Sequence, residues 1–500
     1  MLKFNIQGLS NKFINIFFVF LGILSILGAA SLLRNDLSEL SGKMVLAIDI
    51  AIIGIVLIIP LRKDFKRLDN KVTYLLALTA LFIWQCWIVM TMTSITKWDP
   101  TLILYKAIGH PIWDRNYFSI YPNNLFLLSA EHFLWLIFGK PELVLFTKEL
   151  GFLNIFLLDS SILFLGRILR NNYGKRLSNF YILASLLLIG CSPWITIPYS
   201  DIWAFCVSSL NMSIVLLLTH QENTKLKTSI LTGFLSLLLV VSYFLKPTLV
   251  IFYIALLIIS LLQFVKGERR MSIRVVSLFV ILIVAFFAAF SFYKKNTNLV
   301  SVDENKSFSL FHFAAMGISG RGGYNPQDTF KDKSIKNYEN RKNRDLRVLK
   351  KRFNKMGPTA YERFLMNKQI YNTEDGTFTW GNEADTTMVD KSLSKTLPRR
   401  LFTVKNRASR TNSFSVVMQV IWLLTLLFMV FTCFNEEWMV QLLKYTVIGF
   451  FFFLLLFEGG RSRYVIQFLP FIILLASFGF DNFISKYVRK NNQLATNLDE

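Results

Sequence analysis

Apolar stretches about 20 residues long recur along the sequence and constrain its fold more than any other feature. Phe13–Leu33, Val275–Tyr293 and Val440–Phe457 each have about the length that a helix needs to cross roughly 30 Å of hydrocarbon. The composition agrees, because 53% of the residues are hydrophobic and 17% are charged, a balance too apolar for a water-soluble globular protein. Barrel strands would give shorter, alternating segments, so the sequence predicts an all-α polytopic membrane protein.

The apolar stretches predict about twelve transmembrane helices, placed by length and by the polar residues that bound them. The predicted spans are 13–33, 44–61, 73–93, 148–168, 178–196, 203–219, 229–246, 248–265, 275–293, 414–433, 440–457 and 464–485. A further apolar stretch, Asn124–Gly139, contains Glu131 and His132 among leucines and phenylalanines. It favours an amphipathic helix in the membrane interface over another span.

Positive charge in the short connections sets the expected orientation. The loops 62–71, 167–176 and 266–274 are strongly basic, which predicts that they face the cytoplasm. The order of the spans then brings four polar features to one outer face: Asp99, the turn Tyr199-Ser200-Asp201, the segment 294–413 and the turn Glu458–Arg463. We therefore expect a multi-pass protein of the cell membrane whose site faces outward.

The formal net charge of +23 does not indicate a nucleic-acid partner, because of where the charge lies. Part of it falls in the predicted cytoplasmic loops, and much of the rest falls in the hydrophilic stretch 294–413. The four cysteines have no spacing suited to zinc or to a disulfide framework. We therefore expect the protein to contact membrane lipid and not to bind nucleic acid.

These features divide the chain into five predicted parts. They are an accessory pair of membrane helices (1–71), a membrane core (72–293) with an outer loop (94–147), an extracytoplasmic domain (294–413), C-terminal membrane helices (414–485) and a cytoplasmic tail (486–500). Within the extracytoplasmic part, Arg347–Lys355 predicts a solvated helix, and the glycines of Met316–Pro326 predict a tight loop. That loop lacks the strand–helix pattern of a phosphate cradle, which argues against a nucleotide-binding fold there.

Asp99 is the first candidate for catalysis, because it follows the apolar run Val72–Thr93 within Thr96-Lys97-Trp98-Asp99-Pro100. A carboxylate at the point where a membrane helix meets water is held in place and stays within reach of a lipid-borne substrate. Asp followed by Pro is also a good helix start, so capping of the next helix is the alternative explanation.

The stretch 94–123 predicts a structured loop with the kinds of side chain that bind sugars. Aromatic faces stack on the C–H surfaces of sugar rings, while Asp and Asn bind hydroxyl groups. Asp114, Tyr121 and Asn123 are the candidate substrate-binding residues of this loop. An aromatic belt at the membrane surface is the alternative for its Trp and Tyr residues, but a belt does not account for the clustered Asp and Asn.

Cationic residues on the expected outer side are candidates for binding a lipid phosphate. Lys246 lies in a predicted hairpin, where it could bind phosphate or extend to the lipid headgroups. Arg461 and Arg463 follow two glycines, in a turn that could direct both guanidinium groups at phosphate oxygens. Binding of headgroups at a helix end is the alternative for both arginines. Asp201 and Glu458 complete the predicted substrate-binding set.

Taken together, these motifs resemble the GT-C class of membrane glycosyltransferases. The resemblance rests on the outer loop with Asp99, the helix ending in Phe138-Gly139, Cys191-Ser192-Pro193 before Tyr199-Ser200-Asp201, Lys246-Pro247, and Glu458-Gly459-Gly460-Arg461-Ser462-Arg463-Tyr464. Phe311-His312-Phe313, Gly322-Gly323-Tyr324, Met356-Gly357-Pro358 and Asp375–Trp380 are similar to a largely uncharacterised branch found in Gram-positive bacteria. Many GT-C members carry two neighbouring acids in the first outer loop, whereas here the next acid after Asp99 is Asp114.

The resemblance implies an inverting transferase that moves a sugar from a polyprenyl-phosphate donor to a glycan, lipid or protein of the cell envelope. Asp99 would be the general base, and Arg461, Arg463 and Lys246 would hold the phosphate. No metal-ligand set is predicted, although a divalent cation is compatible with the class. Two other classes stay open: a membrane polymerase that joins lipid-linked repeat units, and a transporter of lipid-linked sugars. Neither an inverted repeat nor a row of midplane charges favours the transporter.

Overall fold

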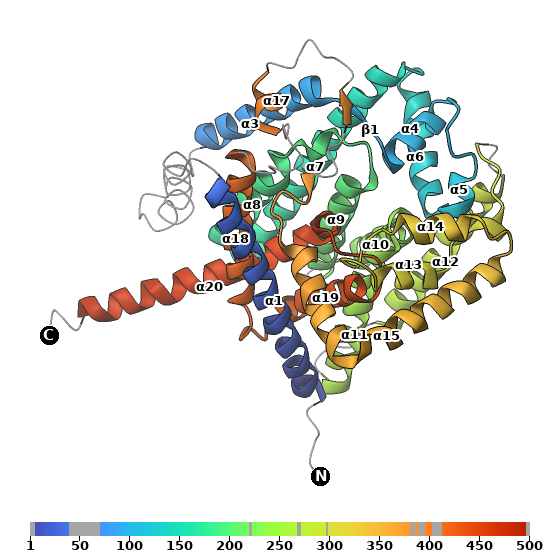
Figure 1. Cartoon of the computed structure of the whole chain (residues 1–500). Coiled ribbons are helices and arrows are strands. Elements are labelled where there is room, and N and C mark those ends of the chain that lie inside the picture. Colours follow the sequence, from blue (N-terminus) through green and yellow to red (C-terminus); the bar gives the residue numbers. More distant parts are fainter. Residues whose placement is uncertain are drawn as a thin grey trace.

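The structure, a computed structural model, describes residues 6–39, 71–219, 223–267, 272–296, 299–380, 386–388, 396–402 and 413–496. The predicted span 44–61 and the basic residues 62–67, 269 and 270 lie outside the described residues. Helices make up almost all of the described chain, and the C-terminal helix extends away from the rest (Figure 1).

Nine helices within the described ranges are long and apolar enough to cross a membrane. They are α1 (Ile6–Glu39), α3 (Lys71–Met92), α7 (Leu143–Tyr173), α9 (Ser200–Leu218), α10 (Lys225–Leu245), α11 (Val250–Lys266), α12 (Ile273–Asn296), α19 (Trp438–Leu456) and α20 (Leu469–Thr496). The predicted class, an all-α polytopic membrane protein, is confirmed.

Two predicted spans differ in the structure. The span expected at 414–433 is α18 (Ser413–Val430), whose apolar part is shorter than those of the nine. The span expected at 178–196 is α8 (Lys175–Ser185), which continues as a π-helical turn over Leu186–Gly190 and then stops. Pro193 explains the stop, because proline has no N–H to donate and its ring clashes with a preceding helical turn.

The first half of α20 is packed inside the helix bundle, where residues such as Leu469, Ile473 and Ala476 are fully buried. Small residues let membrane helices approach closely. At Gly479 of α20, a Cβ atom would lie only 1.8 Å from the carbonyl oxygen of Phe428 in α18, so a larger residue would force the helices apart. On another side, Phe252 of α11 stacks on Phe471 with ring centroids 5.1 Å apart.

The segment after α3 is structured, as predicted. It contains β1 (Ser94–Thr96), α4 (Asp99–Ala107), α5 (Tyr117–Ile120), a 3-10 turn (Pro122–Asn124) and α6 (Leu125–Ile137). At 13 residues, α6 is a short helix and not a span, which agrees with the expectation for Asn124–Gly139. The strand β1 pairs antiparallel with β2 (Thr386–Met388) and joins this segment to a distant part of the chain.

Residues 299–380, called the hydrophilic segment below, cover the end of the bundle where α4 and α5 lie (Figure 1). The segment contains α13 (Leu310–Gly317), α14 (Pro326–Lys333) and α15 (Tyr338–Thr373), and after it comes α17 (Leu397–Phe402). A kink divides α15 at Gly357, whose φ is +71°, just before Pro358. The predicted tight loop is present, because Gly320 and Gly322 adopt φ values of +56° and +83° that favour glycine.

Candidate functional site

Asp99 begins α4 but does not cap it. Trp98 occupies the N-cap position, and Pro100 follows Asp99 in the first turn, where a backbone N–H would have no partner within the helix, so proline costs no hydrogen bond. The Asp99 carboxylate instead meets two tyrosine hydroxyls: Tyr199 donates to its Oδ2 at 3.4 Å, and Tyr117 is a second hydrogen-bonding neighbour. Capping alone therefore does not account for this carboxylate.

The surroundings of Asp99 favour its protonated form more than water would. Burial raises the pKa of Asp99 above its ordinary value, because a carboxylate loses solvation in an apolar environment. The nearby Arg463 guanidinium and the hydroxyls of Tyr117 and Tyr199 lower the pKa again, but only in part. Asp99 is thus a stronger base than an exposed aspartate would be.

A second acid, Asp201, is buried and holds two cations next to Asp99. Arg463 donates from Nε to Asp201 Oδ2 at 2.9 Å, and Lys246 forms an ion pair with the other carboxylate oxygen. The Arg463 guanidinium also lies 3.9 Å from the ring centroid of Trp98, which precedes Asp99. Three separate parts of the chain, the start of α9, the α10–α11 hairpin and the turn before α20, therefore meet at the residues that precede α4.

Close backbone contacts fix the turn that carries Arg463. The amide of Gly459 donates to the carbonyl of Gly322 at 2.8 Å. A Cβ atom at Gly460 would lie 2.5 Å from the carbonyl oxygen of Arg321, so this approach requires glycine. The tight loop of the hydrophilic segment and the turn 458–463 are thus packed backbone against backbone.

Lys368 of α15 is buried beneath the tight loop Met316–Pro326 and the turn 458–463, and it binds backbone next to both. Its fully buried ammonium donates to the carbonyls of Gly317, Leu455 and Phe457 at 2.7, 3.0 and 2.5 Å. Burial lowers the pKa of Lys368 to about 7, and nearby Glu458 acts in the opposite direction. Three donors meet three acceptors, so the protonated amine satisfies every hydrogen bond available to it.

A cleft of about 1010 Å³ opens beside the hairpin that carries Lys246. It is called the aromatic cleft below, because Tyr243 and Phe244 of α10 and Phe287 and Phe290 of α12 line it. The residues that complete its lining are Pro122, Asn123, Leu125, Phe126, Pro247, Ser291, Val300, Ser301, Val302 and Glu304. Its lining thus combines aromatic rings with polar side chains such as Asn123, Ser291 and Glu304.

The structure brings most of the predicted site residues together. Asp201, Lys246 and Arg463 form one contact group, and Tyr199 links it to Asp99 because Arg463 lies 5.0 Å from the Tyr199 ring centroid. Asn123 is linked to it through Asn124, which accepts from Asn123 at 3.3 Å and donates to the Tyr117 hydroxyl at 2.6 Å.

The remaining predicted residues lie around this group or apart from it. The Tyr121 ring lies 5.3 Å from that of Tyr117. Glu458, on the same turn as Arg461, accepts a hydrogen bond from the Tyr464 hydroxyl at 2.8 Å. Asp114 pairs with Lys333 of the hydrophilic segment at 2.6 Å.

Sequence reasoning assigned no role to Tyr117 or Lys368. Tyr117 is one of several tyrosines in an aromatic stretch, and its pattern carries no sign that its hydroxyl faces Asp99. Lys368 stands between Asn367 and Gln369 in a polar helix, a setting typical of a solvated lysine.

One group of described residues could offer three ligand atoms to a metal ion: His312, Asp332 and Asp345. These residues belong to the hydrophilic segment, and Arg344 forms ion pairs with both acids. Protein groups therefore already balance the charge of the two carboxylates, and no ion is needed for that purpose.

The fold and the site define a polytopic integral membrane protein with a buried acid–cation group at one end of its helix bundle. The chain belongs to the family of conserved hypothetical integral membrane proteins, whose profile matches residues 6–484. No curated protein matches the chain. A solved structure similar to it is ArnT from Cupriavidus metallidurans bound to undecaprenyl phosphate, with 13% identity, 82% of this chain and 78% of that chain covered, and a TM-score of 0.36.

Proposed function

We propose that this protein is an inverting glycosyltransferase that moves a sugar from a polyprenyl-phosphate donor to an acceptor of the cell envelope, on the outer face of the membrane. The observation that carries the proposal is the contrast within the site. Loss of solvation leaves Asp99 basic although two tyrosine hydroxyls contact it, and Lys246 and Arg463 bring two cations to the neighbouring Asp201. A transferase needs both a base for the acceptor and cations for the leaving phosphate.

In the proposed step, a hydroxyl of the acceptor attacks the anomeric carbon of the donor sugar. A new C–O bond forms as the bond between that carbon and the phosphate oxygen breaks. The hydroxyl proton passes to Asp99, and the electron pair of the broken bond leaves with polyprenyl phosphate. Attack from the side opposite the leaving group inverts the configuration of the anomeric carbon.

The cations and the aromatic cleft supply the place for the lipid donor. Asp201 keeps Lys246 and Arg463 close to one another, because each binds a different oxygen of its carboxylate. Their charge favours the phosphate as it gains negative charge in the transition state. The aromatic cleft, which begins at Pro247, would hold the first isoprene units of the lipid. This arrangement needs no nucleotide-binding domain, because the lipid carries the sugar.

Other predicted contacts belong to the sugar and to the acceptor. Asn123 lines the aromatic cleft and Tyr121 packs against Tyr117, so a ring face and an amide are proposed to bind the sugar there. Glu458 and Arg461 are proposed to contact the donor from the turn 458–463. Asp114, which pairs with Lys333, is proposed to lie at the acceptor side.

Glycan analysis in the producing cell tests the proposal whichever sugar is transferred. We expect a deletion strain, and one that carries only Asp99→Asn, to lose the same sugar substituent and to accumulate a lipid-linked sugar. Glu339→Gln, a change to an exposed acid of the hydrophilic segment, is the matched control and should restore the substituent. All variants are compared at equal amounts of protein in the membrane.

The same measurement separates the rival functions. Glycan chains of reduced length with their substituents intact would indicate a polymerase. Lipid-linked sugar trapped on the cytoplasmic face would indicate a transporter. Wild-type glycans in the Asp99→Asn strain would contradict the proposed transferase chemistry.

A further inference from the structure

We propose that the exposed face of α14 and α15 is a docking surface for an anionic polymer, one whose repeating units carry phosphate or carboxylate groups. That the polymer is the sugar acceptor rests on the proposed function, whereas the docking itself does not. The surface comprises six exposed cations, called the basic surface below: Lys331, Lys336, Arg347, Lys350, Lys351 and Lys355.

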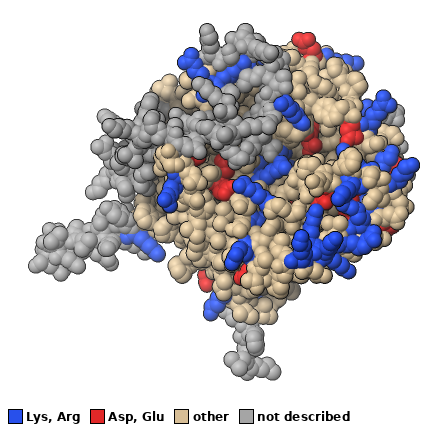
Figure 2. Space-filling view, in the orientation of Figure 1, with Lys and Arg blue, Asp and Glu red and all other residues tan. Residues whose placement is uncertain are grey.

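The cations of α15 lie on one side of the helix. Arg347, Lys351 and Lys355 are four residues apart, and Lys350 is their neighbour three residues after Arg347, so all four share a face. Eight residues of helix span about 12 Å, which makes the array linear. Figure 2 shows Lys and Arg side chains gathered over the part of the molecule where α15 lies in Figure 1.

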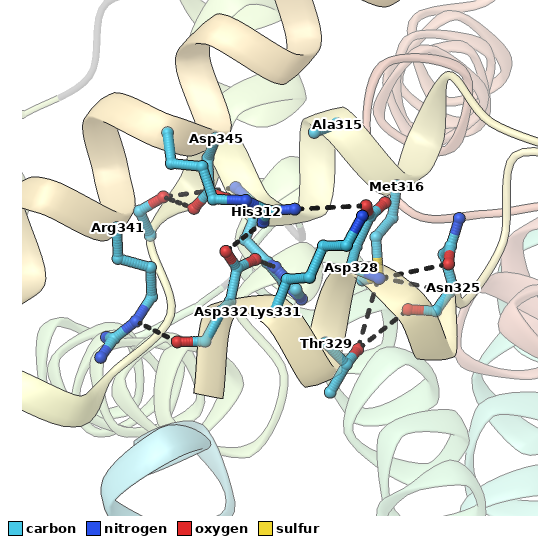
Figure 3. Close-up of polar contacts among 12 residues, drawn as sticks. His312, Ala315, Met316, Asn325, Asp328, Thr329, Lys331, Asp332, Arg341 and Asp345 are labelled. Carbon is cyan, nitrogen blue, oxygen red and sulfur yellow. Dashed lines mark hydrogen bonds and ion pairs between the residues drawn. The ribbon is translucent and has the colours of Figure 1, made fainter. Parts of the chain in front are cut away.

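The acids that could neutralise this surface are buried beneath it. Residues 326–356 contain eleven Lys and Arg but four acids, and three of those acids, Asp328, Asp332 and Asp345, are buried. Arg352 binds Asp328 through both terminal nitrogens, at 2.6 and 3.0 Å, and Arg344 pairs with Asp332 and Asp345. Figure 3 shows the three buried acids beside His312 and Arg341, where α13, α14 and α15 meet.

Other polar groups of this buried cluster are also bound within it, while His312 Nε2 has no hydrogen-bond partner among the described residues. His312 of α13 bonds to Asp332, and Ser309 donates to Asp345 at 2.9 Å. Arg341, also buried, donates to backbone carbonyls such as that of Ile335 at 2.6 Å. Asp328, Asp332, Asp345, His312, Arg344 and Arg352 are together called the ion network below.

Charge is thus sorted between the interior and the exterior of the hydrophilic segment. The ion network uses three acids internally, and the fourth, Glu339, pairs with Lys342 at 3.3 Å. Among the described residues, none of the six cations of the basic surface forms an ion pair. Their positive charge is therefore uncompensated, which favours binding of a flexible polyanion through release of its counterions.

A water-borne polymer fits this surface better than a lipid bilayer does. A helix that lies on a membrane needs an apolar face to insert among the acyl chains. The face of α15 opposite the basic surface is already occupied, since Arg341 and Asp345 are buried against α13 and α14. Two large apolar side chains, Phe330 of α14 and Phe353 of α15, are exposed on these helices, whereas the basic surface carries six cations. Charge therefore dominates what this face presents to a partner.

The same helix connects the basic surface to the candidate site. After the kink at Gly357, α15 continues to Lys368, whose ammonium binds the carbonyls of Leu455 and Phe457 next to the turn 458–463. A polymer held along the first half of α15 would therefore be aligned with the loops that carry Arg463. Such docking would raise the local concentration of acceptor groups near Asp99.

Binding of a simple polyanion tests this inference separately from catalysis. The full-length protein in phosphatidylcholine nanodiscs is titrated with fluorescent linear polyphosphate. We expect binding that weakens steeply with salt, and about tenfold or more weaker binding when Arg347, Lys350, Lys351 and Lys355 are changed together to Gln. Lys225→Gln/Lys227→Gln, which removes two exposed lysines at the far end of α10, is the control and should bind like wild type.

Several outcomes would overturn the docking surface. These are equal affinity of the fourfold variant and wild type, binding that salt does not weaken, and binding to phosphatidylglycerol vesicles but not to polyphosphate. If the fourfold variant unfolds at a lower temperature than wild type, Lys350→Gln/Lys351→Gln replaces it, with an expected loss of about threefold.

Asp99→Asn separates this inference from the proposed function. It should bind polyphosphate like wild type, because Asp99 is not part of the basic surface. If that binding persists while the glycans of the Asp99→Asn strain are normal, the docking surface stands and the transferase proposal falls.

Discussion

Asp99 is half-buried and the acids of the ion network are buried, and the protein surrounds them with different groups. Asp332 is met by Arg344 and His312, and Asp328 by both terminal nitrogens of Arg352. Asp99 is met by the hydroxyls of Tyr199 and Tyr117, while the nearest strong cation, Arg463, is bound to Asp201.

The difference separates an acid that holds structure from one that is available for chemistry. In spite of burial, the hydrogen bond to His312 and the Arg344 charge hold the pKa of Asp332 below its ordinary value, so Asp332 is a weak base. Its neighbour Asp345 differs, because burial and the Asp332 charge raise the pKa of Asp345 to about 6. A carboxylate bound by neutral hydroxyls in a half-buried place keeps a raised pKa and can accept a proton. The ion network should therefore control the stability of the hydrophilic segment, whereas Asp99 should control turnover.

The largest effect is expected for Asp99→Asn in the purified protein. The amide keeps the size of the side chain but cannot accept a proton, so turnover should fall by about 10²–10⁴-fold. Thermal unfolding should be unchanged, because no ion pair is lost. If Asp99→Asn has wild-type turnover, Asp99 is not a catalytic base and does not differ in function from the acids of the ion network.

Asp332→Asn should have the opposite profile. Loss of the buried charge leaves Arg344 without its closest partner, and breaking a buried ion pair costs about 3–5 kcal/mol. Hydrogen exchange of α13 and α14 should accelerate accordingly, while donor binding by the membrane site should be retained. Unchanged exchange in these helices would show that the network does not hold the segment together.

Arg463→Lys tests whether the shape of the guanidinium matters in the membrane site. Lysine keeps the charge but cannot bind Asp201 and a phosphate with a planar fork, so donor binding should weaken by about 1.5–3 kcal/mol. Titration of the purified variant with a polyprenyl-phosphate sugar gives this value. Arg461→Lys is the companion variant, and wild-type affinity in both would assign these arginines to lipid headgroups.

The smallest effect concerns pH and Lys368. Above pH 7 its neutral amine offers two donors to three carbonyls, so the turn 458–463 loosens and activity should fall by about two- to tenfold toward pH 9. The pKa of about 7 lies below the ordinary 10.5, so the unfolded chain binds this proton more tightly and folding stability rises over the same interval. Activity and unfolding temperature should therefore move in opposite directions.

Lys368→Met is the control for the pH measurement. Its activity should be lower than that of wild type at pH 7. Raising the pH from 7 to 9 should then cause no further loss of activity through residue 368. If wild type and Lys368→Met lose activity in parallel from pH 7 to 9, another group causes the fall.

Apolar length was sufficient to predict most of the membrane helices, because hydrocarbon requires a helix of about 20 residues wherever the chain crosses. The order of the spans also placed Asp201, Lys246 and Arg463 at one end of the bundle, since consecutive antiparallel helices bring alternate connections to the same side. The stop before Pro193 was missed, because the apolar run continues in sequence although the helix does not.

The polar parts were harder to predict, because their burial depends on distant segments. The stretch Arg347–Lys355 is helical as expected, but Arg352 is bound to Asp328 and is not solvated. Lys368 is buried only because Gly322 and Gly459 come from far along the chain to pack against it. Periodicity within one helix carries no information about such partners.

The ion pair between Arg463 and Asp201 also sets the order in which the protein can mature. The two residues are 262 positions apart, and ribosomes add roughly 5–20 residues per second, so Asp201 waits roughly 10–50 s for Arg463. During that time Asp201 and Lys246 are present in the membrane without Arg463. A nascent chain halted before the turn 458–463 therefore lacks the cation that binds Asp201 and packs on Trp98, so the site is completed only when the last helix is about to be made.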